Sequence, residues 1–547
     1  MTRKYVPNQI SVPDVTAKEV LAYQIPTPIK LSAFESLLNG YPKEKKEILI
    51  QGFRNGFQIP SSIQNDPQKG DYINHRSLNQ NPEIVQKKLD AELQKGRISG
   101  PYDQPPLENM IFSPLGLVPK KKPGEFRIIH DLSFPKGDSV NSHIQHQDSA
   151  VQYETLDVCL EIIQSIGKGC LVSKADLENA FRIIPIHPKD VRLFGFHWNG
   201  KYYFDKCLPM GCSTSCQVFE SLSESIQWIL VNKLDVRFTS HILDDFIFFG
   251  HPDTNECQKF LNTFLALSQQ INLPVKASKT VLPSTTVTLH GIEVDTIKME
   301  IRLPQDKLEA AKQAVNEMSR RKKVKLQQLQ SLIGTLNFAC RVIVAGRTFL
   351  RRLIDLTKGV QNPNHYIRLN KEARKDLSAW KIFLDQFNGT YICMSNRWVS
   401  SNTLKLFTDA SGSGFAAVFG GRWIQGHFPE EWSSVNIAVK ELLPIVLSVQ
   451  LWGHQIQNTK ILFMSDNQSV VFMINKKTSK DPMLMDLLRK LVVATMMNNI
   501  EFQAKHIPGK HNVIADLLSR FQDQRVFKMA PWLQQSKTDF PKEWLPW

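Results

Sequence analysis

The chain has 547 residues, of which 42% are hydrophobic and 22% are charged. This length exceeds what one hydrophobic core can organise, so we expect several domains of about 100–200 residues each. The 67 Lys and Arg residues outnumber the 52 Asp and Glu residues and give a net charge of +15. Such an excess favours a polyanionic partner, either nucleic acid or an anionic membrane surface, although charge also serves solubility alone.

Secretion and membrane insertion are not expected. The start of the chain is polar and lacks the apolar core of a secretory signal. No run reaches the ~18–20 apolar residues that a membrane-spanning helix needs. The eight cysteines are scattered, and the one close pair, Cys212 and Cys216, has no matching Cys/His pair for zinc. We therefore expect reduced thiols and an intracellular protein, in the cytoplasm, the nucleus or both.

The hydrophobic pattern divides the chain into five regions. Residues 1–80 contain one apolar patch and indicate no chemistry. Short apolar strands alternate with helical stretches over residues 81–302. Residues 303–403 are helical and basic and end in a polar connector with one amphipathic helix near residues 371–387. A second strand-and-helix domain follows over residues 404–525, and residues 526–547 form a tail.

Two adjacent aspartates, Asp244 and Asp245, lie between two apolar strand-like runs. An Asp-rich surface turn is the ordinary explanation of such a pair, but a tight hairpin favours Asn-Gly or Asp-Gly. Like charges between apolar strands are costly unless a cation lies beside them. A third acid, Asp176, ends the β-like run 171–176. Placed beside the hairpin, it would complete the carboxylate set that two Mg²⁺ ions need in phosphoryl transfer.

These segments resemble a known family. The runs around Asp176 and Asp244-Asp245 look like motifs A and C of the reverse transcriptase palm, and Leu208-Pro209-Met210-Gly211 resembles motif B. Residues 117–127 resemble the fingers segment, and Leu289-His290-Gly291 resembles the primer grip. The motifs follow the family's order. The resemblance implies an α+β, right-hand polymerase of fingers, palm and thumb that copies RNA and DNA templates into DNA.

The resemblance also implies roles for single residues. Asp176, Asp244 and Asp245 would bind two Mg²⁺ ions, with Mn²⁺ as a substitute. Phe181 would exclude a ribose 2′-hydroxyl, although a core aromatic is its plain alternative. Two departures, Ile242 where the family usually has Tyr and Met210 where it often has Gln or Phe, affect primer positioning and fidelity. The expected nucleotide-binding residues are Lys121 (or Lys120 or Lys122), Arg127, Phe181, Met210 and Gly211.

A basic helical region follows the palm. Between Glu317 and Asp355 the sequence has no Asp or Glu, and Leu326, Leu329, Ile333 and Leu336 recur at helical spacing. A basic run is often only a solvated face. Its position after the palm fits a thumb that holds a duplex through its phosphates. The expected nucleic-acid-binding residues are Arg320, Arg321, Lys322, Lys323, Arg347 and Arg351.

A second set of acids lies in the last domain. Asp409 and Asp466 each follow a strand-like run, Glu441 opens an apolar helix, and Asp516 lies in Ala515-Asp516-Leu517-Leu518-Ser519-Arg520. Each acid alone could cap a helix, Asp466 most readily. Together they resemble the four-carboxylate set of an α/β ribonuclease H domain, with His506 as its mobile histidine. The resemblance implies two further Mg²⁺ ions, which would activate a water to cut RNA paired with DNA.

Several short phrases resemble one class of retrotransposon. Leu132-Ser133 with Ser139-Val140-Asn141, Gly334-Thr335-Leu336-Asn337-Phe338, and the Ala515–Arg520 phrase look like DIRS-like or Ngaro-like elements, with Gypsy-like elements as the near alternative. The expected partners are an RNA template, a DNA primer, an RNA–DNA hybrid and deoxynucleoside triphosphates, with no membrane. A tyrosine recombinase, if needed, would be encoded elsewhere. The rival interpretation is a domesticated, catalytically idle nucleic-acid-binding protein, which all seven acids oppose.

Overall fold

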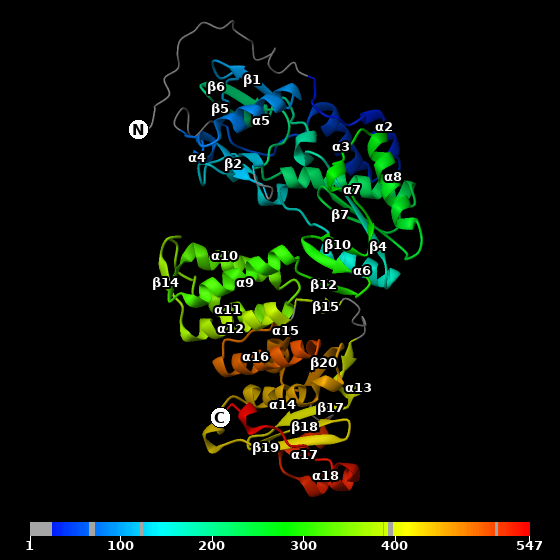
Figure 1. Cartoon of the computed structure of the whole chain (residues 1–547), viewed down its shortest axis with the longest axis vertical. Coiled ribbons are helices and arrows are strands. Elements are labelled where there is room, and N and C mark those ends of the chain that lie inside the picture. The colour runs from blue at the N-terminus through cyan, green and yellow to red at the C-terminus, as the bar shows by residue number, and fades with distance from the viewer. Residues whose placement is uncertain are drawn as a thin grey trace. The chain divides into compact units, whose positions relative to one another are not determined.

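The computed structural model describes residues 24–64, 72–120, 124–386, 388–391, 398–508 and 512–546. The chain divides into two compact units, Met1–Thr285 and Thr286–Trp547, whose helices and strands are labelled in Figure 1. In the described ranges, none of the helices combines the length and the apolar character that crossing a membrane requires. The finer domain limits expected from the sequence remain predictions.

A four-stranded antiparallel sheet of order β7-β8-β4-β9 forms the centre of the first unit. Helices α7 and α8 pack on it. Alternate residues of a strand face the same side, so Phe246 and Phe248 of β8 both contact Phe264 of α8, with ring centroids 4.9 and 5.3 Å away. The elements are β4 (Leu171–Asp176), β7 (Thr239–Ile242), β8 (Asp245–Gly250), β9 (Val281–Ser284), α7 (Ser215–Lys233) and α8 (Glu256–Gln270).

Smaller sheets and short helices complete the first unit. Strands β1, β6 and β5 form one antiparallel sheet, and β2 and β3 form a hairpin. The apolar patch near residue 31 becomes α2 and α3, whose Phe34 and Phe53 join the main core. The bounds are α2 (Leu31–Leu37), α3 (Lys43–Asn55), α4 (Arg76–Asn79), α5 (Pro82–Gln94), β1 (Ile98–Tyr102), β2 (Leu115–Pro119), β3 (Phe126–His130), α6 (Leu156–Ile166), β5 (Gly195–Trp198) and β6 (Lys201–Asp205), with 3-10 turns η3 (Ala180–Ile183), η4 (Val191–Phe194) and η5 (Ala277–Lys279).

The second unit begins with a small sheet and a group of helices. Strands β10, β11, β12 and β15 form an antiparallel sheet, and helix α9 packs against α10 and α12. The basic region is therefore mainly helical, as expected, but it also contains the short strand β13, which pairs antiparallel with β14 beyond α11. The bounds are β10 (Thr286–Leu289), β11 (Ile292–Asp295), β12 (Glu300–Arg302), α9 (Gln305–Arg320), β13 (Lys323–Lys325), α10 (Leu326–Ala339), η6 (Val344–Phe349), α11 (Arg351–Asp355), β14 (Tyr366–Arg368), α12 (Lys371–Gln386) and β15 (Thr390–Tyr391).

The last part of the second unit combines strands with long helices. Strands β17, β18 and β19 are antiparallel, whereas β16, β20 and β21 are parallel. Helix α14 is apolar around most of its circumference and packs on β17, β18 and α16. The bounds are β16 (Val399–Ser400), α13 (Ser401–Leu404), β17 (Leu406–Ala410), β18 (Gly414–Phe419), β19 (Arg422–His427), α14 (Ile437–Trp452), β20 (Lys460–Ser465), α15 (Gln468–Lys476), α16 (Pro482–Met497), β21 (Glu501–His506), α17 (Val513–Ser519) and α18 (Asp523–Met529).

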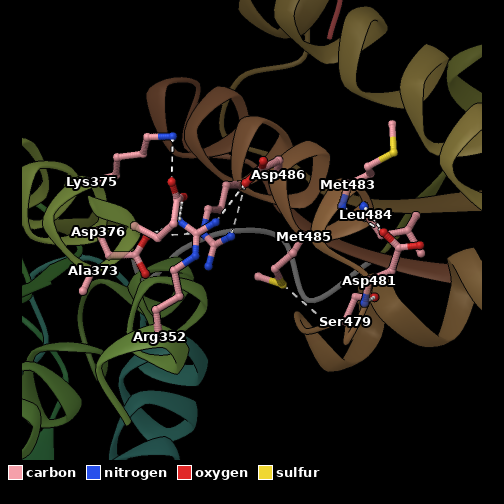
Figure 2. A network of polar contacts seen from close by, with 12 residues as sticks. Arg352, Ala373, Lys375, Asp376, Ser479, Asp481, Met483, Leu484, Met485 and Asp486 are labelled. Carbon is pink, nitrogen blue, oxygen red and sulfur yellow. Dashed lines mark hydrogen bonds and ion pairs between the residues drawn. The ribbon is translucent and has the colours of Figure 1, made fainter. Parts of the chain in front are cut away.

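A charged network joins the helical group to α16. Figure 2 shows the Arg352 side chain reaching toward Asp376 of α12 and Asp486 of α16. Its guanidinium nitrogens lie 3.2 Å from Asp376 and 3.0 Å from Asp486. Arg489 of α16 approaches Asp376 to 3.4 Å. Burial raises the pKa of Asp376 to about 6, although both arginines act in the opposite direction. Arg352 is thus committed to internal partners and is not a free phosphate ligand.

Candidate active sites

The three palm acids meet at one edge of the central sheet. Asp176 ends β4 and is the antiparallel register partner of Asp245, the first residue of β8. Leu243 and Asp244 form the two-residue turn between β7 and β8. Leu243 has a φ of +50°, which is a strained value for a non-glycine residue. The backbone nitrogen of Leu177 donates to the oxygen of Asp244 at 2.9 Å, so the turn is tied to the end of β4.

Mutual repulsion marks these acids as one electrostatic group. Burial, and then the charges of Asp176 and Asp245, raise the pKa of Asp244 to about 6. Burial also raises the pKa of Asp245, against the lowering effect of Lys174, whose Nζ lies 3.8 Å away. A surface turn would leave such carboxyl groups at their ordinary values. The arrangement therefore favours a cation site over the surface-turn alternative.

A lysine that the sequence analysis missed lies at this cluster. Nζ of Lys279, in η5, donates to Oδ2 of Asp176 at 2.7 Å. Burial lowers the pKa of Lys279, but the Asp176 carboxylate outweighs this effect and the net shift is upward. Asp244 and Asp245 contribute in the same direction. A lysine in a polar loop carries no sequence signal of this role, because only the fold brings it to Asp176.

The acids suit a divalent metal chemically, although they are not gathered as a finished ligand set. In the ranges that the structure describes, no three His, Cys, Asp or Glu side chains form a ready metal-binding group. Three carboxylates are nevertheless the hard oxygen donors that Mg²⁺ prefers. Burial and the charge of neighbouring acids both oppose ionisation of Asp244 and Asp245. A divalent cation would remove that opposition, so the donor set fits Mg²⁺.

The expected nucleotide-binding residues have separate structural settings. Phe181 is half-buried and packs edge-to-face on Phe219 of α7, with ring centroids 5.6 Å apart, so its packing on the core is real. Arg127 is exposed on β3. Lys120 is exposed and pairs with Glu125 at 3.7 Å, whereas Lys121 and Lys122 lie outside the described residues. The binding roles of these residues stay predictions.

Gly211 of the expected motif B has a clear backbone reason to be glycine. Its φ is +134°, and a Cβ there would lie 1.9 Å from the backbone oxygen of His130. The backbone nitrogen of His130 also donates to the oxygen of the neighbouring Met210 at 3.0 Å. Any side chain at position 211 would push this segment away from β3. The glycine therefore fixes where the exposed backbone of Met210 and Gly211 lies.

A buried charged network supports both Phe181 and Gly211. Asp205 accepts from Arg182 at 2.6 Å and from Nδ1 of His130 at 2.9 Å. Burial acts to raise the pKa of Asp205, but Arg182 and then His130 outweigh it, and the net shift is downward. Arg182 directly follows Phe181, and His130 contacts the Met210-Gly211 backbone. Sequence reasoning missed this network because its members are far apart in the chain.

The four acids of the second unit also form one electrostatic group. Asp409 lies on β17, Glu441 on α14, Asp466 after β20 and Asp516 on α17. Burial raises the pKa of Glu441 to about 9, with further contributions from Asp409, Asp466 and Asp516. Burial likewise raises the pKa of Asp409 to about 6. The fold thus gathers all four predicted residues. Glu441 lies in the second turn of α14, which begins at Ile437, so it does not open the helix as expected.

The helix-cap alternative for Asp466 is wrong. The next residue, Asn467, caps α15 by accepting from the backbone nitrogens of Ser469 and Val470. Asp466 is exposed, and its carboxylate is not used as a helix cap, so it can join the other acids of the cluster. Nε2 of His506 donates to the backbone oxygen of Asp466 at 3.1 Å, so the predicted histidine lies beside the cluster. Residues 509–511, between His506 and Asp516, lie outside the described ranges.

Two neighbouring residues hold the acids of this cluster in place. The hydroxyl of Ser519 donates to Asp409 at 2.7 Å. Nε of Arg520 pairs with Asp516 at 2.8 Å. Both belong to the Ala515–Arg520 segment, which also contains Asp516. Its serine and arginine therefore have a local structural use, because each holds one member of the carboxylate set.

The six cations predicted to bind a duplex are all exposed, and their binding role stays a prediction. Arg320, Arg321, Lys322 and Lys323 are exposed at the end of α9 and in the segment that follows, and so is Arg347. Arg351 is exposed but pairs with Asp355 at 3.2 Å. A groove of about 350 Å³ between α9 and α10 opens beside Arg321. The absence of acids from this sequence region therefore did not guarantee unpaired cations.

The reverse transcriptase (RNA-dependent DNA polymerase) family model matches residues 118–294, which include all three palm acids. Over 375 residues, or 66% of this chain, the sequence is 23% identical to the genome polyprotein of Petunia vein clearing virus. Over 480 residues, or 83% of this chain, it is 25% identical to the Pol polyprotein of the Drosophila melanogaster transposon opus. The chain spans only 16% of the viral polyprotein and 43% of the transposon polyprotein.

A solved structure gives the same indication for the fold. The foamy viral protease–reverse transcriptase in complex with RNA/DNA hybrid aligns with a TM-score of 0.50 and 17% identity. The alignment covers 88% of this chain and 64% of that chain. At this identity the likeness concerns the fold alone. Residues 118–294 therefore match the reverse transcriptase domain, and the chain is similar to Pol polyproteins of retroviruses and retrotransposons.

Proposed function

We propose that this chain synthesises DNA on RNA and DNA templates and removes the RNA strand of the resulting hybrid. The observation that carries the first activity is the palm cluster at the β4–β8 edge. Its three carboxylates lie together beside the strained Leu243, and burial and neighbouring charge raise the pKa of Asp244 and Asp245. Clustered carboxylates destabilise a protein that has only a structural role, whereas a two-metal polymerase needs their negative charge to bind cations.

In this proposal, Asp176, Asp244 and Asp245 bind two Mg²⁺ ions, or Mn²⁺ as a substitute. When bound, the ions lower the pKa of the primer 3′-hydroxyl and stabilise the charge of the in-line transition state. Lys279 supplies a positive charge to Asp176 in the metal-free protein, at 2.7 Å. Lys174 does the same for Asp245 at longer range. The two lysines keep the acids close together until cations bind.

The nucleotide site is proposed to lie beside these acids. Lys121 and Arg127 hold phosphates of the incoming deoxynucleoside triphosphate, and the Met210-Gly211 backbone lines the site. Phe181 excludes the ribose 2′-hydroxyl. Its support is the rigid position of the ring, which packs on Phe219 and directly precedes the anchored Arg182. A ring held from behind can reject a hydroxyl by sterics, because it cannot move aside cheaply.

The second activity is proposed for the acids around Glu441. Asp409, Glu441, Asp466 and Asp516 bind two Mg²⁺ ions, which activate a water for cleavage of the RNA strand. His506 lies next to Asp466, where it can exchange a proton or contact the released phosphate. The observation that supports this proposal is the pKa of Glu441, which reaches about 9 in the metal-free site.

Duplex binding is proposed for the helical group of the second unit. The exposed cations Arg320, Arg321, Lys322, Lys323, Arg347 and Arg351 contact phosphates. Helix α10 adds an exposed face of neutral residues, Gln327, Gln330, Ser331, Gly334 and Asn337. Apart from its chain neighbours and the backbone of its own helix, a Cβ at Gly334 would meet no atom of the described residues within 4 Å, so packing against other parts of the chain does not require this glycine. A glycine in a helix interior costs about 1 kcal/mol relative to alanine, so close approach of a ligand backbone explains it best.

The proposed setting is a retrotransposon of the DIRS-like or Ngaro-like class, acting in the cytoplasm, the nucleus or both. The partners are an RNA template, a DNA primer, their hybrid and deoxynucleoside triphosphates. A tyrosine recombinase encoded elsewhere would supply integration. The phrases quoted from residues 132–141, 334–338 and 515–520 support this assignment.

The decisive experiment is extension of a DNA primer on an RNA template with Mg²⁺, followed by a hybrid-cleavage assay on the same preparation. We expect both activities in the wild-type chain and neither with the metal chelated. Binding of the primer–template without extension, in Mg²⁺ and in Mn²⁺, would instead identify the catalytically idle nucleic-acid-binding protein.

A further inference from the structure

Two buried ionisable residues beneath the palm turn are not used by the proposed chemistry. Glu220 of α7 is 4% exposed and His241 of β7 is 3% exposed. Burying such groups is costly unless they are hydrogen-bonded or paired. A core position of this kind would normally hold an apolar residue. Their presence under the turn that carries Asp244 therefore needs a specific explanation.

Glu220 contacts the backbone of that turn directly. The backbone nitrogen of Leu243 donates to Oε2 of Glu220 at 3.2 Å. One helical turn further along α7, the hydroxyl of Ser223 donates to the backbone oxygen of Leu243 at 2.8 Å. Helix α7 thus satisfies both backbone groups of the residue with the strained φ of +50°. A strained residue persists only when its surroundings over-determine it, and these two contacts supply that constraint.

A chain of hydrogen bonds fixes the orientation of Glu220. Nε2 of Gln227 donates to Glu154 at 3.0 Å, so Oε1 of Gln227 faces His241. Nδ1 of His241 must then carry a hydrogen. Nε2 of His241 lies 3.2 Å from Oε1 of Glu220, in ion-pair range but without the angle of a regular hydrogen bond. The chain of contacts from Glu154 through Gln227 and His241 therefore ends at Glu220 in a close polar contact.

The other end of this chain is equally constrained. Oε2 of Glu154 accepts from the hydroxyl of Ser240 at 2.5 Å and from the backbone nitrogen of His241 at 3.2 Å. Glu154 is therefore hydrogen-bonded to strand β7, and Glu220 is hydrogen-bonded to the turn that follows it. Strand β7 pairs with β8 along one edge, and Glu154 and Glu220 add contacts to Ser240, His241 and Leu243 beyond that pairing. These contacts matter because β7 is the edge strand of its sheet.

We propose that Glu220 is a positioning residue for the proposed DNA synthesis, acting through the Leu243 backbone to hold Asp244 in place for metal binding. The inference rests on the proposed polymerase function. The Oε2 atom of Glu220 performs this role by accepting from the Leu243 nitrogen, and His241 orients that atom. Any side chain of the same shape that keeps an acceptor there should therefore preserve most of the activity, whereas an apolar side chain of similar length should not.

The test compares E220Q and E220M with the wild-type chain in single-nucleotide extension at saturating primer–template. E220M leaves the Leu243 nitrogen without its acceptor, and misplacement of a catalytic group by about 1 Å can cost about 100-fold in rate. We expect a loss of that order in kcat for E220M, with a raised Mg²⁺ concentration for half-maximal rate. E220Q retains the acceptor, so its kcat should fall by at most about threefold. If Glu220 only filled space, E220Q and E220M would instead lose similar amounts of activity.

Two further variants keep the test decisive. S223A removes the second contact to Leu243 by deleting a single hydroxyl, so it should fold and should lower kcat by about tenfold. S225A is the matched control, because Ser225 is buried on the same helix and donates to the Leu222 backbone rather than to the turn. S225A should extend like the wild type. Binding of primer–template, measured without nucleotide, should be unchanged in all four variants.

The outcomes separate the two proposals. If the wild-type chain does not extend primers, the proposed function fails. If it extends primers but E220M and S223A match S225A in kcat and in Mg²⁺ dependence, the positioning role of Glu220 is wrong. Equal losses in E220Q and E220M, with lowered melting temperatures for both, would also overturn it, because they would indicate a general packing role.

Discussion

The two carboxylate clusters solve the same electrostatic problem in different ways. In the palm, Asp176 ends β4, Asp244 lies on the turn and Asp245 begins β8, and Lys279 and Lys174 offset part of their charge. Around Glu441, the acids come from four elements and are offset mainly by Arg520, which pairs with Asp516. The pKa of Asp244 rises to about 6, whereas that of Glu441 rises to about 9. The larger rise in pKa therefore belongs to Glu441, the buried acid that has no cation pair described above.

The largest effect should come from removing a palm acid. D244N or D176N deletes a charged metal ligand, so primer extension should fall on the order of 10³-fold or more. Folding should survive, because loss of one like charge relieves repulsion. Extension is measured on an RNA template and cleavage on a preformed hybrid. Near-wild-type extension in either variant would break the assignment of this cluster to synthesis.

The mirror experiment breaks the second cluster. D466N should lower cleavage of RNA in a hybrid by about 10²-fold or more, because an exposed metal ligand is lost. Extension by the same preparation should continue. Loss of both activities in a folded protein would show that the two clusters are not separate sites.

Sugar selection should respond more moderately. F181A opens space where a 2′-hydroxyl would lie, and exclusion of a small group by sterics is worth about 10–200-fold. Incorporation of ribonucleotides relative to deoxynucleotides should rise within that range. Single-turnover rates with both nucleotides give the ratio. An unchanged ratio would return Phe181 to a purely structural role against Phe219.

The difference between the clusters should be visible as stability. A carboxyl whose folded pKa is raised binds its proton more tightly in the folded state, so stability falls as pH rises from 4.5 toward about 9 for Glu441. At pH 8 without metal, E441Q should raise the melting temperature by about 2–4 °C. D244N should gain less, because the pKa of Asp244 rises only to about 6. Added Mg²⁺ should remove the advantage of E441Q, and thermal scans at pH 5 and pH 8 test this.

The smallest effect concerns duplex binding, on which the activities proposed for both clusters depend. Replacing Arg320, Arg321, Lys322 and Lys323 with Gln should weaken binding to any primer–template irrespective of its sequence. The slope of log K against log salt should flatten by about 0.9 for each lost phosphate contact. Processivity should fall, whereas single-nucleotide addition at saturating duplex should not. Filter binding across a salt series measures the slope, and an unchanged slope would mean a solvated face.

Local signals carried much of the prediction. Strand β4 was expected to end at Asp176 and does, and the helix expected near residues 371–387 is α12. Each followed from an apolar run or a helical period that tertiary contacts did not override. The acids were expected to gather because each ends or adjoins such an element. Asn467 shows the limit of this reasoning, because two adjacent residues competed for one helix cap and the sequence pattern did not decide between them.

Contacts between distant segments could not be predicted in the same way. Lys279 reaches Asp176 across 103 positions, and Arg182 reaches Glu92 across 90. Glu220 carries no sequence signal of its position, because only the fold buries it beneath Leu243. Arg352 lies in an acid-free stretch, yet its partners come from α12 and α16. Composition reports the charge of a segment, but only three-dimensional packing reports what that charge faces.

The Arg352–Asp376–Arg489 network has a practical consequence for dividing the chain. A truncation before residue 404 would remove Arg489 and Asp486, and would leave the buried Asp376 with Arg352 but without its contact to Arg489. Removing one side of a buried ion pair typically costs about 3–5 kcal/mol. A shortened protein or a chimera with a foreign C-terminal half should therefore aggregate unless Asp376 is neutralised with it. Exchange of either half between related sequences would meet the same constraint, since both halves of the network must be inherited together.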